Sequence, residues 1–284
     1  MDVITAPSEL RKALDAARDR GRTVGFVATM GFFHEGHLSL MRRARADRDV
    51  VAVSIFVNPL QFGPQEDFAS YPRDTEADLR RAEGEGVDVV FLPEVGDMYP
   101  AGEPQVTVDP GPLGGRLEGA SRPGHFRGVL TVVAKLFHLV GESSAYFGEK
   151  DYQQLVLVRQ MAAELSFRVD VVGCPTVRDP DGLAMSSRNV HLSPGERTAA
   201  LGLSRSLRAA AGLLREGARR SRTLVARMGA EIRSEPLIDL DYADVVDEDT
   251  LEPIEIVDRP ARALVAARVG TPRLIDNMLL ESGL

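Results

Sequence analysis

The sequence predicts an α/β fold, a doubly wound parallel sheet followed by a smaller C-terminal α+β domain. Over the first 175 residues, apolar runs alternate with amphipathic segments, the pattern of parallel strands joined by helical crossovers. The run Val50–Val57 is almost entirely apolar, which suits a strand that is buried on both faces. From about Val177 the order changes to long helices followed by strand-like runs.

Each element of the first part follows from its local pattern. Runs rich in β-branched and aromatic residues predict strands at Val24–Ala28, Val50–Val57, Val87–Leu92, Ala145–Phe147 and Arg168–Val172. Apolar residues at helical spacing predict helices over Ser8–Arg20, from His37 onward, and over Thr75–Glu83, Gly128–Val140 and Asp151–Leu165.

The C-terminal part opens on a helix start. Ser193-Pro194-Gly195-Glu196 has the form of a capping box with proline at the first helical position, and it predicts a helix through about Glu216. A second helix is expected near Leu224–Arg233, and strands at Leu240–Val246, Arg262–Val269 and Arg273–Asp276. We therefore expect a Rossmann-like domain over residues 1–176 and a second domain over 177–284, able to close as a lid over the ligand site.

Composition narrows the class of protein. The 284 residues, 44% of them hydrophobic, can bury a sizeable core. A net charge of -8 argues against nucleic-acid or anionic-membrane partners, and no apolar run reaches the roughly 18 residues of a membrane span. Cys174, the single cysteine, cannot form an internal disulfide and is expected to be a small buried residue. A cytoplasmic enzyme fits these features.

Two histidines stand at the first strand-to-helix turn, in His34-Glu35-Gly36-His37. A helix N-terminus attracts anions, and two imidazoles beside it can donate hydrogen bonds to a phosphate as its charge grows. A lone histidine is more often a structural hydrogen-bonder, but this pair, with a glycine that lets a ligand approach, favours a nucleotide site. A metal site is the rival, and the sequence has no further Cys or His cluster to supply ligands.

Further candidate phosphate-binding residues lie in two other segments. Lys150 stands at an expected helix start, where its charge opposes the helix dipole unless an anion lies between them. In Met185-Ser186-Ser187-Arg188-Asn189, hydroxyls and a guanidinium could clamp a phosphate. A solvated lysine and a polar surface loop are the plain alternatives. Because ligands bind outside the carboxyl ends of the strands in such sheets, we expect these segments to converge with the histidines on one crevice.

Weaker signals come from polar residues near other expected strand ends and loops. The stretch Arg122–Gly128 carries two arginines and a histidine, which suits a carboxylate or phosphate, although a mobile surface loop has the same composition. Asn58, Gln61 and Gln154 are neutral groups suited to holding hydroxyls and a carboxylate. The sequence has no Walker A loop, no G-x-G-x-x-G after the first strand and no G-x-S-x-G, which disfavours P-loop, dinucleotide and α/β-hydrolase chemistry.

Together these motifs resemble the pantothenate synthetase family, the pantoate–β-alanine ligases of the nucleotidyltransferase superfamily with a His-x-Gly-His signature. The resemblance covers nearly the whole chain and includes Thr29-Met30-Gly31, Phe56–Phe62, Tyr71-Pro72-Arg73, His125–Val129, Phe147–Gln154 and Met185–Asn189. It implies that the carboxylate of pantoate attacks the α-phosphate of ATP, releasing pyrophosphate, and that the amine of β-alanine then attacks the pantoyl adenylate, releasing AMP. It also implies Mg²⁺ with the ATP, a homodimer and a place in pantothenate biosynthesis.

The resemblance carries roles to matching positions. It implies catalytic contacts to the phosphates of ATP for His34, His37, Lys150, Ser186, Ser187 and Arg188, and further ATP-binding positions at Met30, Gly148, Asp151 and Met185. It implies that Gln61 and Gln154, with Met30, hold pantoate, and that Asn58, Tyr71, Arg122 and His125 line the region near the pantoate and amine sites. The ligands of the metal on the protein side remain unknown. The scheme needs no protein nucleophile, because a carboxylate and an amine already carry the attacking lone pairs.

The chain departs from the family pattern at a few positions that bear on affinity and not on the reaction. Ala28 stands where the family commonly has proline, Phe32-Phe33 is bulkier than in some members, and Gly124 adds mobility to its loop. Two alternatives stay open. One is another nucleotidyltransferase of the same superfamily, which keeps the nucleotide in its product. The other is a non-catalytic nucleotide-binding module, which would be expected to have lost His37, Lys150 or the Ser186–Arg188 segment.

Overall fold

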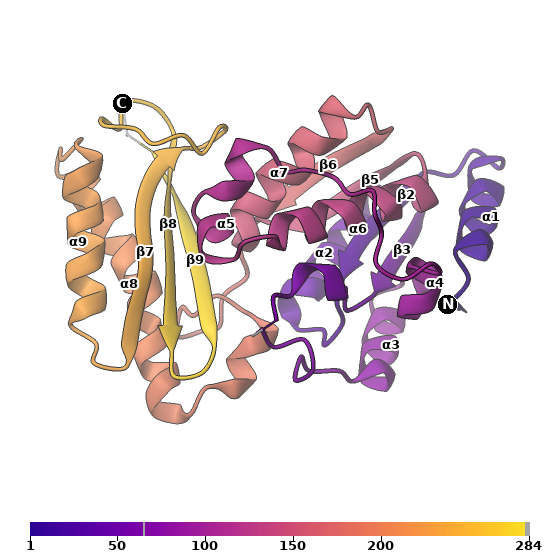
Figure 1. Ribbon diagram of the computed structural model, residues 1–284, viewed down its shortest axis with the longest axis horizontal. Coiled ribbons are helices and arrows are strands. Elements are labelled where there is room, and N and C mark those ends of the chain that lie inside the picture. Colours follow the sequence, from indigo (N-terminus) through magenta and orange to yellow (C-terminus); the bar gives the residue numbers. More distant parts are fainter. Residues whose placement is uncertain (65, 282–284) are drawn as a thin grey trace. The chain divides into compact units, whose positions relative to one another are not determined.

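The computed structural model describes residues 1–64 and 66–281, and the chain divides into two compact units (Figure 1). Unit 1 comprises Met1–Glu149 and Gln154–Pro175. Unit 2 comprises the described residues from Thr176 onward together with the short segment Lys150–Gln153. The expected ligand-binding and lid roles of residues 1–176 and 177–284 concern function and stay a prediction.

Within the described part of unit 1, six strands form a parallel sheet in the order β1-β4-β3-β2-β5-β6. Their bounds are β1 Asp2–Ile4, β2 Val24–Thr29, β3 Val50–Ile55, β4 Val89–Phe91, β5 Ser143–Gly148 and β6 Val169–Cys174. All residues of β3 are buried, as expected for a strand covered on both faces. The predicted parallel α/β sheet is confirmed.

The order of the strands decides where the sequence motifs lie. β3, β2 and β5 are neighbours in the middle of the sheet. His34 follows β2, Asn58 follows β3, and Gly148 is the last residue of β5. The chain moves outward to one side of β2 through β3 and β4, and to the other side through β5 and β6, so the carboxyl end of β2 lies at a topological switch point. Open α/β sheets bind their ligands at such points.

Helices of unit 1 connect these strands. Their bounds are α1 Pro7–Arg18, α2 Glu35–Asp47, α3 Thr75–Gly84, α4 Val95–Met98, α5 Glu118–Ser121, α6 His125–Val140 and α7 Tyr152–Glu164, with 3₁₀ turns η1 Pro59–Gln61, η2 Pro112–Gly115 and η3 Glu149–Asp151. The first two residues of α7 group with unit 2. α6 begins at His125 and not at Gly128, because Gly124 takes a φ of 86° and turns the chain directly into the helix. The expected loop over Arg122–Gly128 is therefore partly helical.

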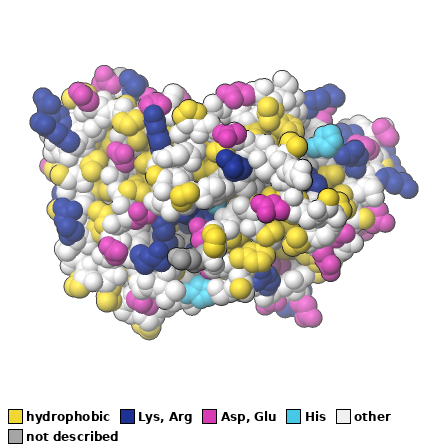
Figure 2. All heavy atoms as spheres, viewed as in Figure 1, with side chains coloured by type: hydrophobic (Ala, Val, Ile, Leu, Met, Phe, Trp, Pro, Cys, Tyr) yellow, Lys and Arg dark blue, Asp and Glu magenta, His cyan; other side chains and the backbone are white. Residues whose placement is uncertain are grey.

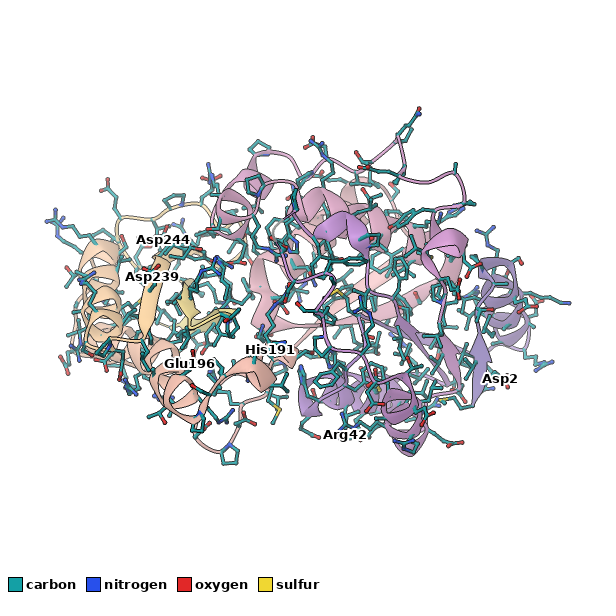
Figure 3. The ribbon with its side chains drawn as sticks, turned by 60° about the horizontal axis from the view of Figure 1, so that its bottom comes forward. Asp2, Arg42, His191, Glu196, Asp239 and Asp244 are labelled. Carbon is teal, nitrogen blue, oxygen red and sulfur yellow. The ribbon has the colours of Figure 1, made fainter. Side chains whose placement is uncertain are left out.

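Unit 2 has an antiparallel sheet in the order β7-β8-β9, with the bounds β7 Ile238–Asp247, β8 Ala261–Val269 and β9 Arg273–Leu280. It also contains η4 Ser187–His191, α8 Pro194–Arg215 and α9 Ser221–Arg233. His191 and Glu196 mark the end of η4 and the first turn of α8 (Figure 3). The predicted capping box is confirmed, since Ser193 N donates to Glu196 Oε2 at 2.8 Å and Glu196 N donates to Ser193 Oγ at 3.3 Å.

Lys and Arg side chains lie interspersed with acidic ones on the face that Figure 2 shows. Among the described helices, none is long and apolar enough to cross a bilayer. Cys174 is buried as predicted, and burial raises the pKa of its thiol, which keeps the sulfur protonated and unreactive.

Candidate active site

The turn between β2 and α2 is held by Asp78 of α3. The backbone turns through Gly31 with a φ of 84° and Phe32 with a φ of 53°. Asp78, 2% exposed, accepts the backbone N–H groups of Phe32 at 2.6 Å and Phe33 at 2.7 Å. Burial raises the pKa of this carboxyl, and the two amides oppose that shift. A Cβ at Gly31 would lie 2.9 Å from the Asp78 carboxylate, so the turn needs glycine for space as well as for its φ.

This turn presents a pair of histidines at the N-terminus of α2. The backbone N–H of Gly36 donates to Nδ1 of His34 at 3.1 Å, and the N–H of His34 donates to Nδ1 of His37 at 3.3 Å. Because each Nδ1 accepts, a neutral imidazole at either position carries its proton on Nε2. The ring centroids lie 4.2 Å apart. Two Nε2–H donors beside a helix N-terminus form an arrangement that stabilises a phosphate.

An amide network adjoins this turn. Gln61, 9% exposed, donates through Nε2 to Sδ of Met30 at 3.3 Å, and its Oε1 accepts from Nδ2 of Asn58 at 3.1 Å. A thioether is a weak acceptor, so a substrate hydroxyl or carboxylate would be a better partner for the Gln61 amide. Met30 directly precedes the turn in the chain, so this contact joins the amide network to the segment that leads to the histidine pair.

Asn58 shapes η1. Its Nδ2 also donates to the carbonyl of Gly128 at 3.1 Å, and its Oδ1 accepts from the hydroxyl of Tyr99 at 2.9 Å and from the amide of Leu60 at 3.3 Å. The residue is 1% exposed. These protein partners favour a supporting role, in which Asn58 fixes the loop that carries Gln61.

Arg122 and His125 meet at the backbone of Gln61. Arg122 pairs with Glu66 through Nε at 2.8 Å and Nη2 at 2.5 Å, and its Nη1 lies 3.0 Å from Nε2 of His125. A guanidinium only donates, so Nε2 of His125 accepts and Nδ1–H donates to the Gln61 carbonyl at 2.9 Å. Burial and the Arg122 charge lower the pKa of His125 to about 4. The imidazole is therefore neutral near pH 7.

The other predicted residues of unit 1 are Tyr71, Gly148 and Gln154. Tyr71 is buried and packs edge-on against Phe62, with centroids 6.0 Å apart. Gly148 ends β5, and a Cβ there would find no heavy atom within 4 Å, which leaves space beside it. Gln154 lies half-buried in the first turn of α7.

Unit 2 carries the other predicted ATP-binding residues apart from Gly148. They are Lys150, Asp151, Met185, Ser186, Ser187 and Arg188. Lys150 and Ser186 line one small cavity together with Asn189 and Asp276. Ser186 caps η4, since its Oγ accepts the backbone N–H of Arg188 at 3.3 Å. The structure thus brings the lysine and the serine segment together within unit 2. The expected convergence of this set with the histidines on one triphosphate stays a prediction.

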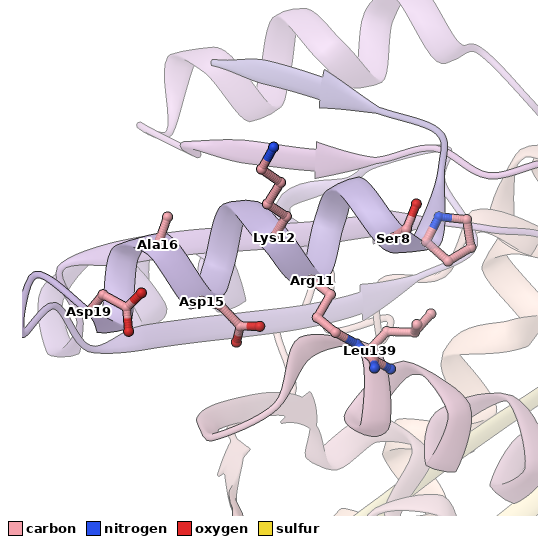
Figure 4. Close-up of a pocket in the computed structure, with 8 residues that line it drawn as sticks. Ser8, Arg11, Lys12, Asp15, Ala16, Asp19 and Leu139 are labelled. Carbon is pink, nitrogen blue, oxygen red and sulfur yellow. The ribbon is translucent and has the colours of Figure 1, made fainter.

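A separate groove in unit 1 runs along α1, with Leu139 of α6 on its wall (Figure 4). Ser8, Arg11, Lys12 and Asp15 line it, so it mixes charges of both signs. No predicted site residue is among those that line this groove, and it is not the candidate active site.

Sequence reasoning missed three residues that support the site: Asp78, Glu66 and Tyr99. Only Asp78 carries a signal in the sequence, because it shares the inward face of α3 with Ala82, where a carboxylate needs partners. Glu66 and Tyr99 lie outside any periodic pattern.

Comparisons with known proteins identify relatives of this chain. The model of the Pantoate-beta-alanine ligase family matches residues 2–279. The chain is 54% identical to the pantothenate synthetase of Rubrobacter xylanophilus over 285 residues, which cover 98% of each chain. The solved pantothenate synthetase of Thermus thermophilus matches with a TM-score of 0.92 and 48% identity, covering 98% of this chain and 99% of its own.

A second solved relative was crystallised with ligands. It is the pantoate-beta-alanine ligase of Francisella tularensis complexed with beta-gamma ATP and beta-alanine, which matches with a TM-score of 0.82 and 33% identity, over 100% of this chain and 99% of its own. The regions matched by the family model and by this structure include the histidine turn, the amide network and the serine segment. The chain therefore belongs to the Pantoate-beta-alanine ligase family.

Proposed function

We propose that the protein joins pantoate to β-alanine with ATP, through a pantoyl adenylate, and releases pyrophosphate and then AMP. The observation that carries the proposal is the contact between Met30 and Gln61. It gives the Gln61 amide a weak partner, Met30, which stands four residues before His34 in the chain, and we assign a hydroxy acid to Gln61 and a phosphate to the histidines. Family membership and the ligands of the Francisella tularensis relative support the choice of substrates.

In the first step a carboxylate oxygen of pantoate attacks the α-phosphorus of ATP, and the bond to the β-phosphate oxygen breaks. The electron pair leaves with pyrophosphate. Negative charge grows on the phosphate oxygens, and the Nε2–H groups of His34 and His37 donate to it. We assign Lys150 and the Ser186–Arg188 segment to the same triphosphate, Asp151 to the ribose side of ATP, and Met185 to a further contact with ATP. Gln61 and Gln154 orient the attacking pantoate.

In the second step the amine of β-alanine attacks the acyl carbon of the pantoyl adenylate. The bond between that carbon and the phosphate oxygen breaks, AMP leaves with the electron pair, and the nitrogen gives up its extra proton to water. We assign Arg122 to the carboxylate of β-alanine. Its guanidinium already pairs with Glu66, so the substrate must share or displace that partner. Neutral His125 holds the guanidinium beside the Gln61 backbone.

Magnesium would enter with ATP. Mg²⁺ prefers phosphate oxygens and water, with one or two carboxylates, over a cage built by the protein. Over residues 1–64 and 66–281, no group of three or more His, Cys, Asp or Glu side chains is arranged to hold a metal. A metal carried by the phosphates of ATP would neutralise charge on the leaving pyrophosphate. By the resemblance to the family we also propose a homodimer that works in the cytoplasm, in pantothenate biosynthesis.

The test supplies ATP, Mg²⁺ and pantoate whose carboxylate is labelled with ¹⁸O, with and without β-alanine. Release of AMP in repeated turnovers should require both organic substrates, and one ¹⁸O atom should appear in AMP, because the attacking oxygen stays on the α-phosphate. A stable adenylylated product would favour another nucleotidyltransferase. Binding of ATP without turnover would favour a non-catalytic module, and AMP without the label would exclude the adenylate.

A further inference from the structure

The segment Lys150–Gln153 groups with unit 2 although it follows a strand of unit 1. Contacts with the C-terminal sheet explain this. Nδ2 of Asn277 in β9 donates to the backbone carbonyl of Lys150 at 2.9 Å. The guanidinium of Arg262 in β8 lies 3.7 Å from the ring centroid of Tyr152, and the Tyr152 hydroxyl donates to Glu248 at 3.2 Å. The backbone of Lys150 is thus bonded to β9, and Tyr152, two residues further on, packs against Arg262 of β8.

These anchoring groups are buried and connected to one another. Nη1 of Arg262 donates to Oδ1 of Asn277 at 3.2 Å, and Nη2 donates to Glu248 at 2.7 Å. Tyr152, Arg262 and Asn277 are at most 5% exposed. The amide of Asn277 therefore uses both of its ends, accepting from Arg262 and donating to Lys150. A buried network of this kind is rigid because each member loses a partner when another one moves.

Asp276, which precedes Asn277 in β9, holds the second segment that we assign to the triphosphate, Ser186–Arg188. Asp276, 3% exposed, accepts from Arg178 at 2.7 and 2.8 Å. Arg178 bridges to Ala184, directly before Met185–Arg188. Because side chains alternate along a strand, Asp276 and Asn277 act from opposite faces of the sheet. One strand therefore anchors both the lysine and the serine segment, which line the same cavity.

We propose that Asn277 is a positioning residue for Lys150, and that β9 sets the spacing between Lys150 and Ser186 before ATP binds. This inference rests on the proposed role of Lys150 at the triphosphate. A lysine side chain is long and flexible, so its ammonium group reaches a defined place only if the backbone that carries it is held. The bond to the Lys150 carbonyl acts directly on that backbone. Without the bond from Asn277, the binding of ATP must also order the backbone of Lys150, which lowers the affinity for ATP.

The test compares Asn277→Asp with Met278→Ala in the full chain. Asp keeps an acceptor for Arg262 and removes the donor to Lys150. Met278 lies on the other face of β9, packed against the hydrophobic core of unit 2, so its truncation lowers stability without touching Lys150. For Asn277→Asp we expect kcat/KM for ATP to fall by about 10-fold to 100-fold, and the affinity for MgATP to fall in calorimetry, while Met278→Ala keeps both near wild type.

A Lys150→Ala background separates positioning from a general loss of structure. If Asn277 acts through Lys150, adding Asn277→Asp to Lys150→Ala should change the MgATP affinity by less than about twofold. The same loss in both backgrounds, or an equal loss in Met278→Ala, would overturn the proposal. A wild type that binds MgATP but releases no AMP would overturn the proposed function alone, since the affinities still decide the role of Asn277. A wild type that binds no MgATP would overturn both.

Discussion

The carboxylate of Asp78 accepts the backbone N–H of Phe33 at 2.7 Å, across 45 residues of sequence, and so fixes the backbone one residue before His34. The same carboxylate accepts the N–H of Phe32. Arg81, one turn further along α3, donates to the carbonyl of Phe33. α3 thus holds the turn through the backbone N–H groups of Phe32 and Phe33 and through the carbonyl of Phe33. The orientation of the two histidine side chains therefore depends on α3, a helix that carries no predicted catalytic residue.

Replacing Asp78 should affect stability and turnover together. Asp78→Ala removes the acceptor of one buried and one half-buried amide, which costs about 1–3 kcal/mol of unfolding free energy, and it frees the turn that carries the histidines, so kcat should fall at least tenfold. Urea unfolding and AMP release measure the two effects. Glu76→Ala on the same helix is the control, because its pair with Arg80 is exposed and should contribute little. Wild-type turnover in Asp78→Ala would contradict the role of the clamp.

The two nitrogens of His37 should have separable roles. His37→Asn places an amide oxygen near the position of Nδ1, so it can still accept from the backbone of His34, but it offers no donor at the position of Nε2. We expect near-normal stability and a fall in kcat of about 10² to 10³, the usual effect of losing one preorganised donor to a growing charge. His37→Gln reaches the Nε2 position and should keep more activity. Equal rates for the two variants would refute the assignment of the protons.

Strong local patterns made most of the fold predictable. The apolar run of β3 and the capping residues of α8 each predict their element from a few neighbouring positions. β1 and α4 were not expected, since elements of three or four residues are too short to show a period. The histidine pair was visible because both residues lie in one motif. The bonds of Asp78 to Phe33 and of Asn277 to Lys150 join residues 45 and 127 positions apart, so local patterns do not reveal them.

His125 should make the fold sensitive to acid. Burial and Arg122 lower its pKa from 6.5 to about 4 in the folded chain. Between these two values the unfolded chain binds a proton that the folded chain does not, so the unfolding free energy falls as the pH drops from 6.5 to about 4. His125→Asn keeps a donor for the Gln61 carbonyl and does not titrate. Urea unfolding across this window should show a shallower pH dependence for the variant, and parallel curves would contradict the low pKa.

The close approach of α6 to η1 should set the affinity for pantoate. A Cβ at Gly128 would lie 2.1 Å from the carbonyl oxygen of Leu60 and 2.6 Å from the backbone nitrogen of Gln61. Gly128→Ala must therefore push η1 outward and move Gln61 away from Met30. We expect a loss of about 1–3 kcal/mol in unfolding free energy and a rise in KM for pantoate that exceeds any rise in KM for ATP.

Gly84→Ala is the matched control for this substitution. A Cβ at Gly84, in the last turn of α3, would meet no heavy atom within 4 Å, and alanine favours the helix. This variant should keep both KM values and lose no stability. Urea unfolding and initial rates at varied pantoate and ATP measure the two variants side by side. If Gly128→Ala loses stability but raises both KM values equally, η1 does not position pantoate through Gln61, and the amide network only supports the fold.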